Sequence, residues 1–168
     1  MTQRLLFEER VLFSPNLPEA VNQLLQQAVA ASHAEKPLAE KLFKQAQQLD
    51  PGCLQTYFAL YKFYFYQGRL QEAEREVLAG LNQAARQGNF PADFRQLAGQ
   101  AGEWDMYASD TALFYLYTLK ALAFIKLRQD LADEARAVLA AMEILDPQDK
   151  SGASVIMQLS AALEPEAA

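Results

Sequence analysis

The chain has 168 residues, of which 51% are hydrophobic, and only seven glycines and seven prolines, a composition that suits one compact domain built from helices. The net charge of −6 and the scattered lysines and arginines argue against nucleic-acid binding, and no apolar run is long enough to span a membrane. The single cysteine excludes an internal disulfide. The first residues, MTQRLLFEERVLF, carry charges inside their apolar stretch, unlike a signal peptide, so we expect a cytoplasmic protein.

The pattern predicts one all-α domain over residues 1–168. Its expected helices span residues 18–33, 37–49, 53–67, 70–87, 111–128, 131–145 and 151–163. Residues 1–17 form an N-terminal decoration, 20–87 hold two helical pairs, and 111–163 hold a third pair with a C-terminal capping helix. Residues 88–110 are an insert rich in aromatic residues, which we expect to pack onto the helices.

Small residues recur in the second helix of each pair, at Ala39, Ala73 and Ala135, where they let two helices approach closely. A larger apolar residue follows four positions later in each case, at Phe43, Val77 or Leu139, to fill the space between neighbouring pairs. The phrases QLDP and ILDP end two of these helices, because the residue before proline is biased away from helical angles. One helix-turn-helix unit is therefore used several times.

These residues resemble the tetratricopeptide repeat. The likeness covers roughly residues 20–87 and 111–163, and it implies an all-α solenoid of about three repeats. In this comparison Tyr57, Leu60, Tyr64 and Gly68 match the first half of the pattern. The third repeat is interpreted as carrying an extra residue or two in its turn near 128–130.

The resemblance also implies which positions face the concave groove. In the second repeat they are Gln55, Phe58, Lys62, Phe65 and Tyr66, and in the third they are Tyr115, Thr118, Leu122, Ile125 and Lys126. Such a groove, with aromatic rings and a cation, suits an apolar helix or an extended peptide. The alternative is that Phe58 and Phe65 are buried under the insert or under a terminal arm. The predicted partner-binding residues are Gln55, Phe58, Lys62, Phe65, Tyr66, Tyr115, Lys126 and Trp104.

No catalytic, cofactor-binding or metal-binding pattern is recognisable. His33 is the only histidine and Cys53 the only cysteine. A Ser-His-Asp or Cys-His arrangement would therefore depend on His33 alone, and the two residues do not supply a zinc set. Tetratricopeptide domains that bind a terminal carboxylate use lysine and asparagine side chains in the groove. Such a clamp is disfavoured here, because the matching positions hold Lys62 and Leu122 and not asparagine. We therefore expect a protein without enzymatic activity. A small enzyme that uses His33 or Cys53 is the alternative of a different class.

Several phrases resemble a narrower group, the small tetratricopeptide proteins encoded in bacterial nitrogen-fixation gene clusters: LLFEERVLF, ALYKFYFYQGRLQEAE, FYLYTLKALAFIKLR and SGASVIMQL. That resemblance implies an accessory or chaperone-like factor that binds nitrogenase, such as its molybdenum–iron protein, or an assembly intermediate of its maturation. Two alternatives stay open: a cytoplasmic adaptor for an unrelated partner, and self-association through an exposed end of the array. The sequence leaves the oligomeric state undecided.

Overall fold

The computed structural model describes residues 17–163, and all regular structure within that range is helical. The elements are α2 (Glu19–Ala31), α3 (Lys36–Leu49), α4 (Leu54–Tyr66), α5 (Leu70–Gly88), α6 (Phe94–Gly99), the 3-10 turn η1 (Ala101–Glu103), α7 (Asp110–Arg128), α8 (Ala132–Leu145) and α9 (Ser154–Leu163). The predicted all-α fold class is confirmed, and every predicted helix is present. Most of the predicted N-terminal decoration lies outside the described residues.

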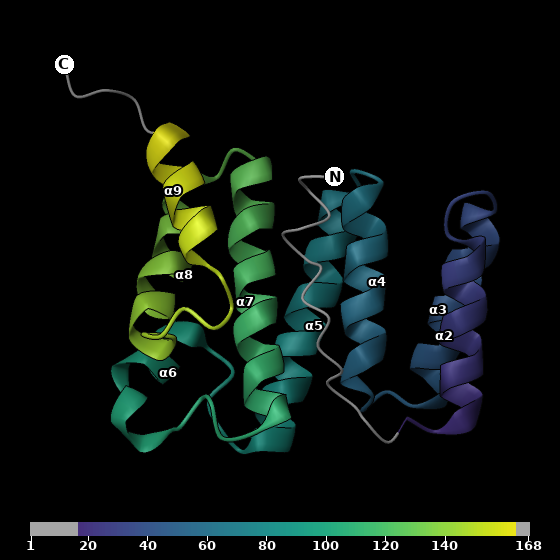
Figure 1. Cartoon of the computed structure of the whole chain (residues 1–168), viewed down its shortest axis with the longest axis horizontal. Coiled ribbons are helices and arrows are strands. Elements are labelled where there is room, and N and C mark those ends of the chain that lie inside the picture. Colours follow the sequence, from purple (N-terminus) through teal and green to yellow (C-terminus); the bar gives the residue numbers. More distant parts are fainter. Residues whose placement is uncertain (1–16, 164–168) are drawn as a thin grey trace.

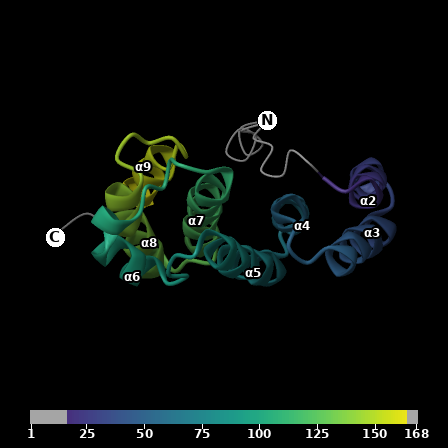
Figure 2. The same cartoon turned by 90° about the horizontal axis from the view of Figure 1, so that it is seen from below.

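Three helical hairpins, α2–α3, α4–α5 and α7–α8, stand side by side along the long axis of the molecule (Figure 1). Seen end-on, the helices form two rows (Figure 2). The inner row, on the concave side, contains α2, α4, α7 and α9, and the outer row contains α3, α5 and α8. This arrangement is that of a helical solenoid, in which each hairpin packs on its neighbours.

The recurring small residues explain how closely the hairpins pack. Ala39, Ala73 and Ala135 are all fully buried, and Phe43 and Val77, one turn further on, are 2% and 0% exposed. The central helices α4 and α7 contact neighbours on several sides, so they are buried around most of their circumference. The core therefore runs through the middle of the array.

The insert packs onto the array through aromatic residues. Helix α5 ends at Gly88, and the left-handed backbone of the next residue, Asn89 (φ 58°), turns the chain back, so that Phe90 N–H donates to Ala85 C=O. The Phe90 ring then meets Tyr115 of α7 edge-on, with centroids 5.2 Å apart, and contacts Trp104. Because α6 in turn packs on α8, the insert covers the α7–α8 hairpin, as predicted.

A buried polar cluster fixes the loop between α8 and α9. The Asp146 carboxylate accepts hydrogen bonds from the Tyr107 hydroxyl at 2.5 Å and from the Ser151 hydroxyl at 2.6 Å. Lys120 of α7, also buried, donates to the Ser151 carbonyl at 2.7 Å. Burial and the bond to Asp146 raise the pKa of Tyr107 to about 12, so this hydroxyl stays a donor at neutral pH.

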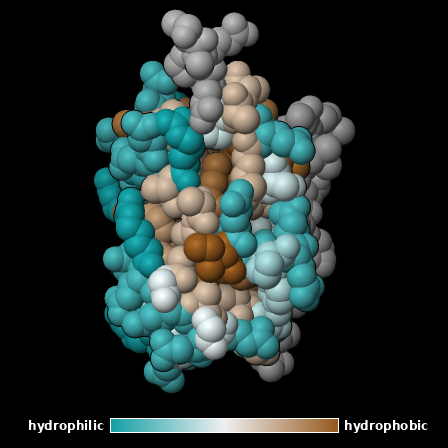
Figure 3. All heavy atoms as spheres, turned by 90° about the vertical axis from the view of Figure 1, so that its left-hand side faces the viewer, coloured by the Kyte–Doolittle hydropathy of each residue, from teal (hydrophilic) through white to brown (hydrophobic). Residues whose placement is uncertain are grey.

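The α8–α9 end of the array exposes apolar side chains. Ile144 is 55% exposed, Val155 44% and Leu159 41%. Figure 3 shows an apolar strip on this end, flanked by hydrophilic residues. Helix α9 thus occupies the position of the predicted capping helix, but its outer surface is less polar than a purely solubilising cap would be.

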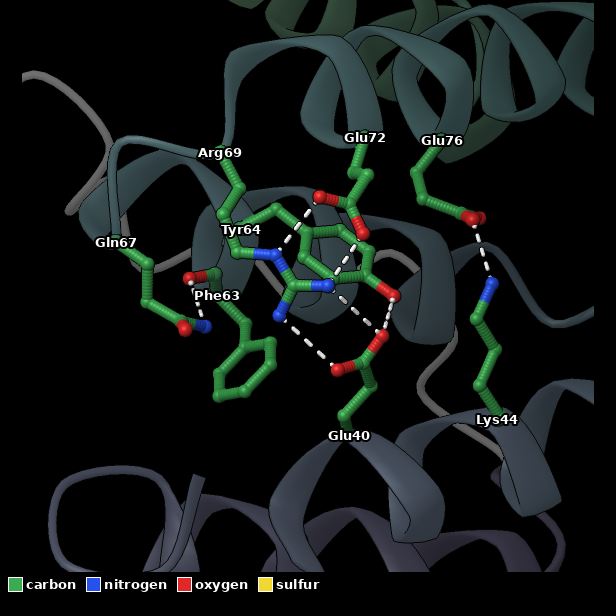
Figure 4. A network of polar contacts seen from close by, with 8 residues as sticks. All are labelled: Glu40, Lys44, Phe63, Tyr64, Gln67, Arg69, Glu72 and Glu76. Atoms are coloured by element: carbon green, nitrogen blue, oxygen red, sulfur yellow. Dashed lines mark hydrogen bonds and ion pairs between the residues drawn. The ribbon is translucent and has the colours of Figure 1, made fainter. Parts of the chain in front are cut away.

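The joint between α3 and the α4–α5 hairpin, called here the first seam, combines a buried aromatic contact with a polar network (Figure 4). Phe43 of α3 meets Phe63 of α4 with ring centroids 5.2 Å apart. Arg69, in the α4–α5 turn, pairs with Glu40 of α3 at 3.0 Å and with Glu72 of α5. The Tyr64 hydroxyl donates to Glu40 at 2.7 Å. The hydrogen bond from Arg69 holds the pKa of the Glu40 carboxyl below its ordinary value, despite partial desolvation. Glu76 adds an ion pair with Lys44 at 2.9 Å.

The joint between the α4–α5 hairpin and α7, called here the second seam, has an apolar centre. Gly80 of α5 lies so close to its neighbours that a Cβ atom there would stand 3.2 Å from the Phe114 ring and 3.3 Å from Tyr57 Cβ. Phe114 is fully buried. Polar contacts also cross this seam. The Tyr61 hydroxyl and Thr118 Oγ1 lie 3.3 Å apart within the core, and Lys126 of α7 pairs with Glu74 of α5 at 2.9 Å.

Candidate functional site

Helix α4 brings an aromatic and cationic stripe to the concave side of the array. Phe58, Lys62 and Phe65 follow one another at helical spacing, and the Lys62 ammonium lies 4.6 Å from the centre of the Phe58 ring. Tyr66, at the end of the stripe, is 43% exposed and meets Phe65 edge-on. These are the groove positions predicted for the second repeat.

The predicted groove positions of the third repeat are displaced from the concave side. The Tyr115 hydroxyl donates to the Ala92 carbonyl of the insert, and the residue is fully buried. Lys126 pairs with Glu74 of α5 at 2.9 Å and with Glu134 of α8, which both belong to the outer row. The predicted register for α7 is therefore wrong.

The error comes from the turn that follows α7. The α4–α5 turn and the α7–α8 turn have the same length, residues 67–69 and 129–131, and no extra residue is present. Asp130 (φ 65°) takes the left-handed conformation that Gly68 (φ 75°) has in the equivalent place. Counting back from Ala135 by the spacing that applies to Ala73 places the following residues on the inner side: Tyr117, Lys120, Phe124, Leu127 and Arg128. The spacing from Ala135 was therefore a signal in the sequence that could have given the correct register.

The contacts agree with the corrected register. Phe124 lies 5.3 Å from Phe65, centroid to centroid, and the Arg128 guanidinium lies 5.5 Å from the Phe65 ring centre. Tyr117 and Lys120 reach toward the loop before α9, where they donate to the carbonyls of Lys150 and Ser151. We define the inner face as the remaining set: Gln55, Phe58, Lys62, Phe65, Tyr66, Phe124, Leu127 and Arg128.

The three phenylalanines of the inner face are buried, with Phe58, Phe65 and Phe124 at 6%, 2% and 7% exposed. Of the two covers considered from the sequence, the insert packs at a different place, because its Phe90 contacts Tyr115 and its helix α6 lies against α8. A terminal arm lies outside the described residues. Trp104 is half-buried next to Phe90, within the insert and away from the inner face.

An open pocket of about 550 Å³ lies between the α4–α5 and α7–α8 turns. It is lined by Gly68, Leu70, Gln71, Glu74, Lys126, Gln129 and Leu131. Burial opposes the charge on Glu74, but hydrogen bonds from Lys126 and Gln129 outweigh it and lower the pKa of the carboxyl. The cation and anion at this pocket thus satisfy each other, and Lys126 acts as a link between helices.

The two residues considered for chemistry lie apart from the inner face. His33 is exposed in the turn between α2 and α3, and Cys53 is a buried free thiol just before α4. Among residues 17–163, no group of three histidine, cysteine or acidic side chains is arranged to hold a metal ion. None of the helices in the described range is long and apolar enough to cross a membrane.

No protein-family model matches the chain, and no solved structure matches it. The chain is similar to a protein of Azotobacter chroococcum mcd 1, described as an uncharacterized 19.8 kDa protein in the nifW 5′ region. The two are 28% identical over 133 residues, which cover 79% of this chain and 72% of that protein. This similarity connects the chain with a protein from a nitrogen-fixation gene region.

Proposed function

We propose that the chain is a non-enzymatic protein-binding module of the tetratricopeptide kind, whose inner face binds its partner. The observation that carries the proposal is the inner face itself, where the cations of Lys62 and Arg128 lie against aromatic rings of α4. Both residues belong to helices of the inner row of the solenoid, α4 and α7. Aromatic and arginine side chains contribute most of the binding energy in many protein interfaces. A concave solenoid surface is a common place for an extended or helical partner.

The partner we propose is a nitrogenase component, such as the molybdenum–iron protein, or an assembly intermediate of nitrogenase. Support comes from the similarity to a protein of the nifW 5′ region and from the sequence resemblance to small repeat proteins of nitrogen-fixation gene clusters. The chain would then act as an accessory or chaperone-like factor, holding its client without chemical change.

Affinity capture from the native cell, grown with and without fixed nitrogen, tests the proposal. Nitrogenase components should co-purify only from cells grown without fixed nitrogen. A Tyr66→Ala/Arg128→Glu variant should recover about five- to thirtyfold less, as expected for the loss of one or two anchor residues. Leu78→Ala/Arg75→Glu is the matched control, since these exposed residues lie on α5 in the outer row.

Each outcome of these experiments tests a different part of the proposal. If the control loses the client as strongly as the inner-face variant, the inner face is not the binding surface. If nitrogenase components are missing under both growth conditions, the proposed partner is wrong. Unchanged biological function in a Cys53→Ala/His33→Ala variant is expected, and a complete loss would favour the enzyme alternative.

A further inference from the structure

The burial of the inner-face phenylalanines is unusual for the concave side of an open helical array. The inner row has α2, α4, α7 and α9 side by side, and the outer row lies on its other side (Figure 2). Rings on this concave side would be expected to contact solvent or a ligand, yet Phe58, Phe65 and Phe124 are at most 7% exposed. Since the insert packs on the α7–α8 hairpin, it does not provide the cover. We propose that the chain's own N-terminal segment, residues 1–16, docks along the inner face.

The entry point and length of this segment fit the proposal. Leu17, the first described residue, packs against the core immediately before α2, which belongs to the inner row. Sixteen residues reach up to about 50 Å when extended and about 24 Å as a helix. Helix α4 has 13 residues and α7 has 19, which correspond to about 20 and 28 Å. The segment is therefore long enough to follow both helices when extended, and as a helix it spans α4 and most of α7.

The chemistry of the segment matches that of the face. Its apolar residues are Met1, Leu5, Leu6, Phe7, Val11, Leu12 and Phe13. Leaving so many apolar side chains in water would cost far more than docking them on the phenylalanine rings. Glu8, Glu9 and Arg10 lie between the two apolar groups, and the two carboxylates complement Lys62 and Arg128 in charge. The five-residue segment after α9, EPEAA, has no large apolar residue for this purpose.

This assignment deepens the proposed function and rests on it for its consequence. A partner that binds the inner face must displace residues 1–16, so the segment is both a competitor and a template for the partner. The partner's binding element should then share its chemistry: a short stretch with two apolar groups separated by acidic residues. Displacement would also release a segment that can bind elsewhere on the partner.

Paramagnetic broadening in the purified full-length chain tests the docking without any partner. A spin label at Gln3→Cys, in a Cys53→Ser background, should broaden the amide signals of α4 and α7 more than those of α3 and α8. The same label combined with Leu6→Asp/Leu12→Asp should lose this selectivity, while circular dichroism shows an unchanged helical content. Selective broadening that survives these substitutions, or no selectivity from the start, would overturn the proposal.

A mixture of spin-labelled chain and isotope-labelled chain distinguishes a second copy as the source of the segment. If broadening between chains in the mixture equals the broadening within one chain, the segment docks on a second copy. That result would overturn the proposal of intramolecular docking. Trypsin gives an independent readout, because it cleaves after Arg4 and Arg10 only when the segment is released. We expect cleavage to be about tenfold or more faster in Leu6→Asp/Leu12→Asp than in the unmodified chain. Equal rates would contradict docking, whatever the capture experiment finds.

Discussion

The two seams of the array join similar hairpins by different means. At the first seam, one buried aromatic contact, between Phe43 and Phe63, is accompanied by a polar network. In this network the partly exposed Arg69 pairs with Glu40 and Glu72 (Figure 4). At the second seam, Gly80 allows close approach to the fully buried Phe114. Partly exposed ion pairs add little free energy, whereas a well-packed apolar contact adds several kcal/mol. The α2–α3 hairpin should therefore separate from the array more readily than the α4–α5 and α7–α8 hairpins separate from each other.

The largest effect is expected at the second seam. Phe114→Ala removes a fully buried ring and should lower the free energy of unfolding by about 3–5 kcal/mol. Urea unfolding followed by circular dichroism measures this change. Leu78→Ala, at a side chain that is 44% exposed, is the control and should change the free energy by less than about 0.5 kcal/mol. Equal effects of the two substitutions would contradict an apolar second seam.

Gly80→Leu should destabilise by less, about 1–3 kcal/mol, because the new side chain would press on Tyr57 and Phe114. Helix propensity alone predicts the opposite sign, since glycine costs about 1 kcal/mol relative to good helix formers. Urea unfolding decides between the two. A gain in stability would show that the close approach at Gly80 is unimportant.

Arg69→Gln at the first seam should cost about 1 kcal/mol, because the ion pairs it removes are partly exposed. The loss should be local. Hydrogen exchange of the α2–α3 amides should accelerate about fivefold, as 1 kcal/mol implies, while α5 and α7 change little. Lys41→Gln, at an exposed lysine of α3, is the matched control. Acceleration in all helices alike would mean that the hairpin does not open independently.

Acid should weaken the first seam by the smallest amount. The pKa values of Glu40 and Glu72 lie below the ordinary 4.5, so their contribution is complete above pH 4.5 and is lost as pH falls through the lowered values. The difference in urea midpoint between the unmodified chain and Glu40→Gln should therefore shrink as pH falls from 5 to 3. A constant difference would show that ionised Glu40 does not stabilise the seam.

Much of the fold could be read from the sequence, because Ala39, Ala73 and Ala135 mark where helices approach closely. The register of α7 could not be read from its own residues. Almost all sides of this helix are apolar, so no polar stripe shows which residues face outward. The turn also misled the prediction, since Asp130 adopts the left-handed conformation expected of glycine.

The site was predictable in one half only. On α4, Phe58, Lys62 and Phe65 were predicted correctly as neighbours on one face, because Gly68 and Ala73 of the same repeat stand at the positions usual for the pattern. On α7, Phe124 and Arg128 were missed and Tyr115 and Lys126 were selected, because a shift by two residues turns a helix face by about 200°. The ion pair between Arg69 and Glu40 joins side chains 29 residues apart in sequence, which periodicity does not reveal.

The single cysteine lies where its chemical labelling can report on the opening of the first seam. Cys53 is 5% exposed and lies between α3 and α4, where the chain passes from the first hairpin to the second. A thiol reagent can reach its sulfur only when the structure around this junction opens. The rate of labelling in the unmodified protein therefore measures how often the α2–α3 hairpin separates from the array. Arg69→Gln should increase this rate.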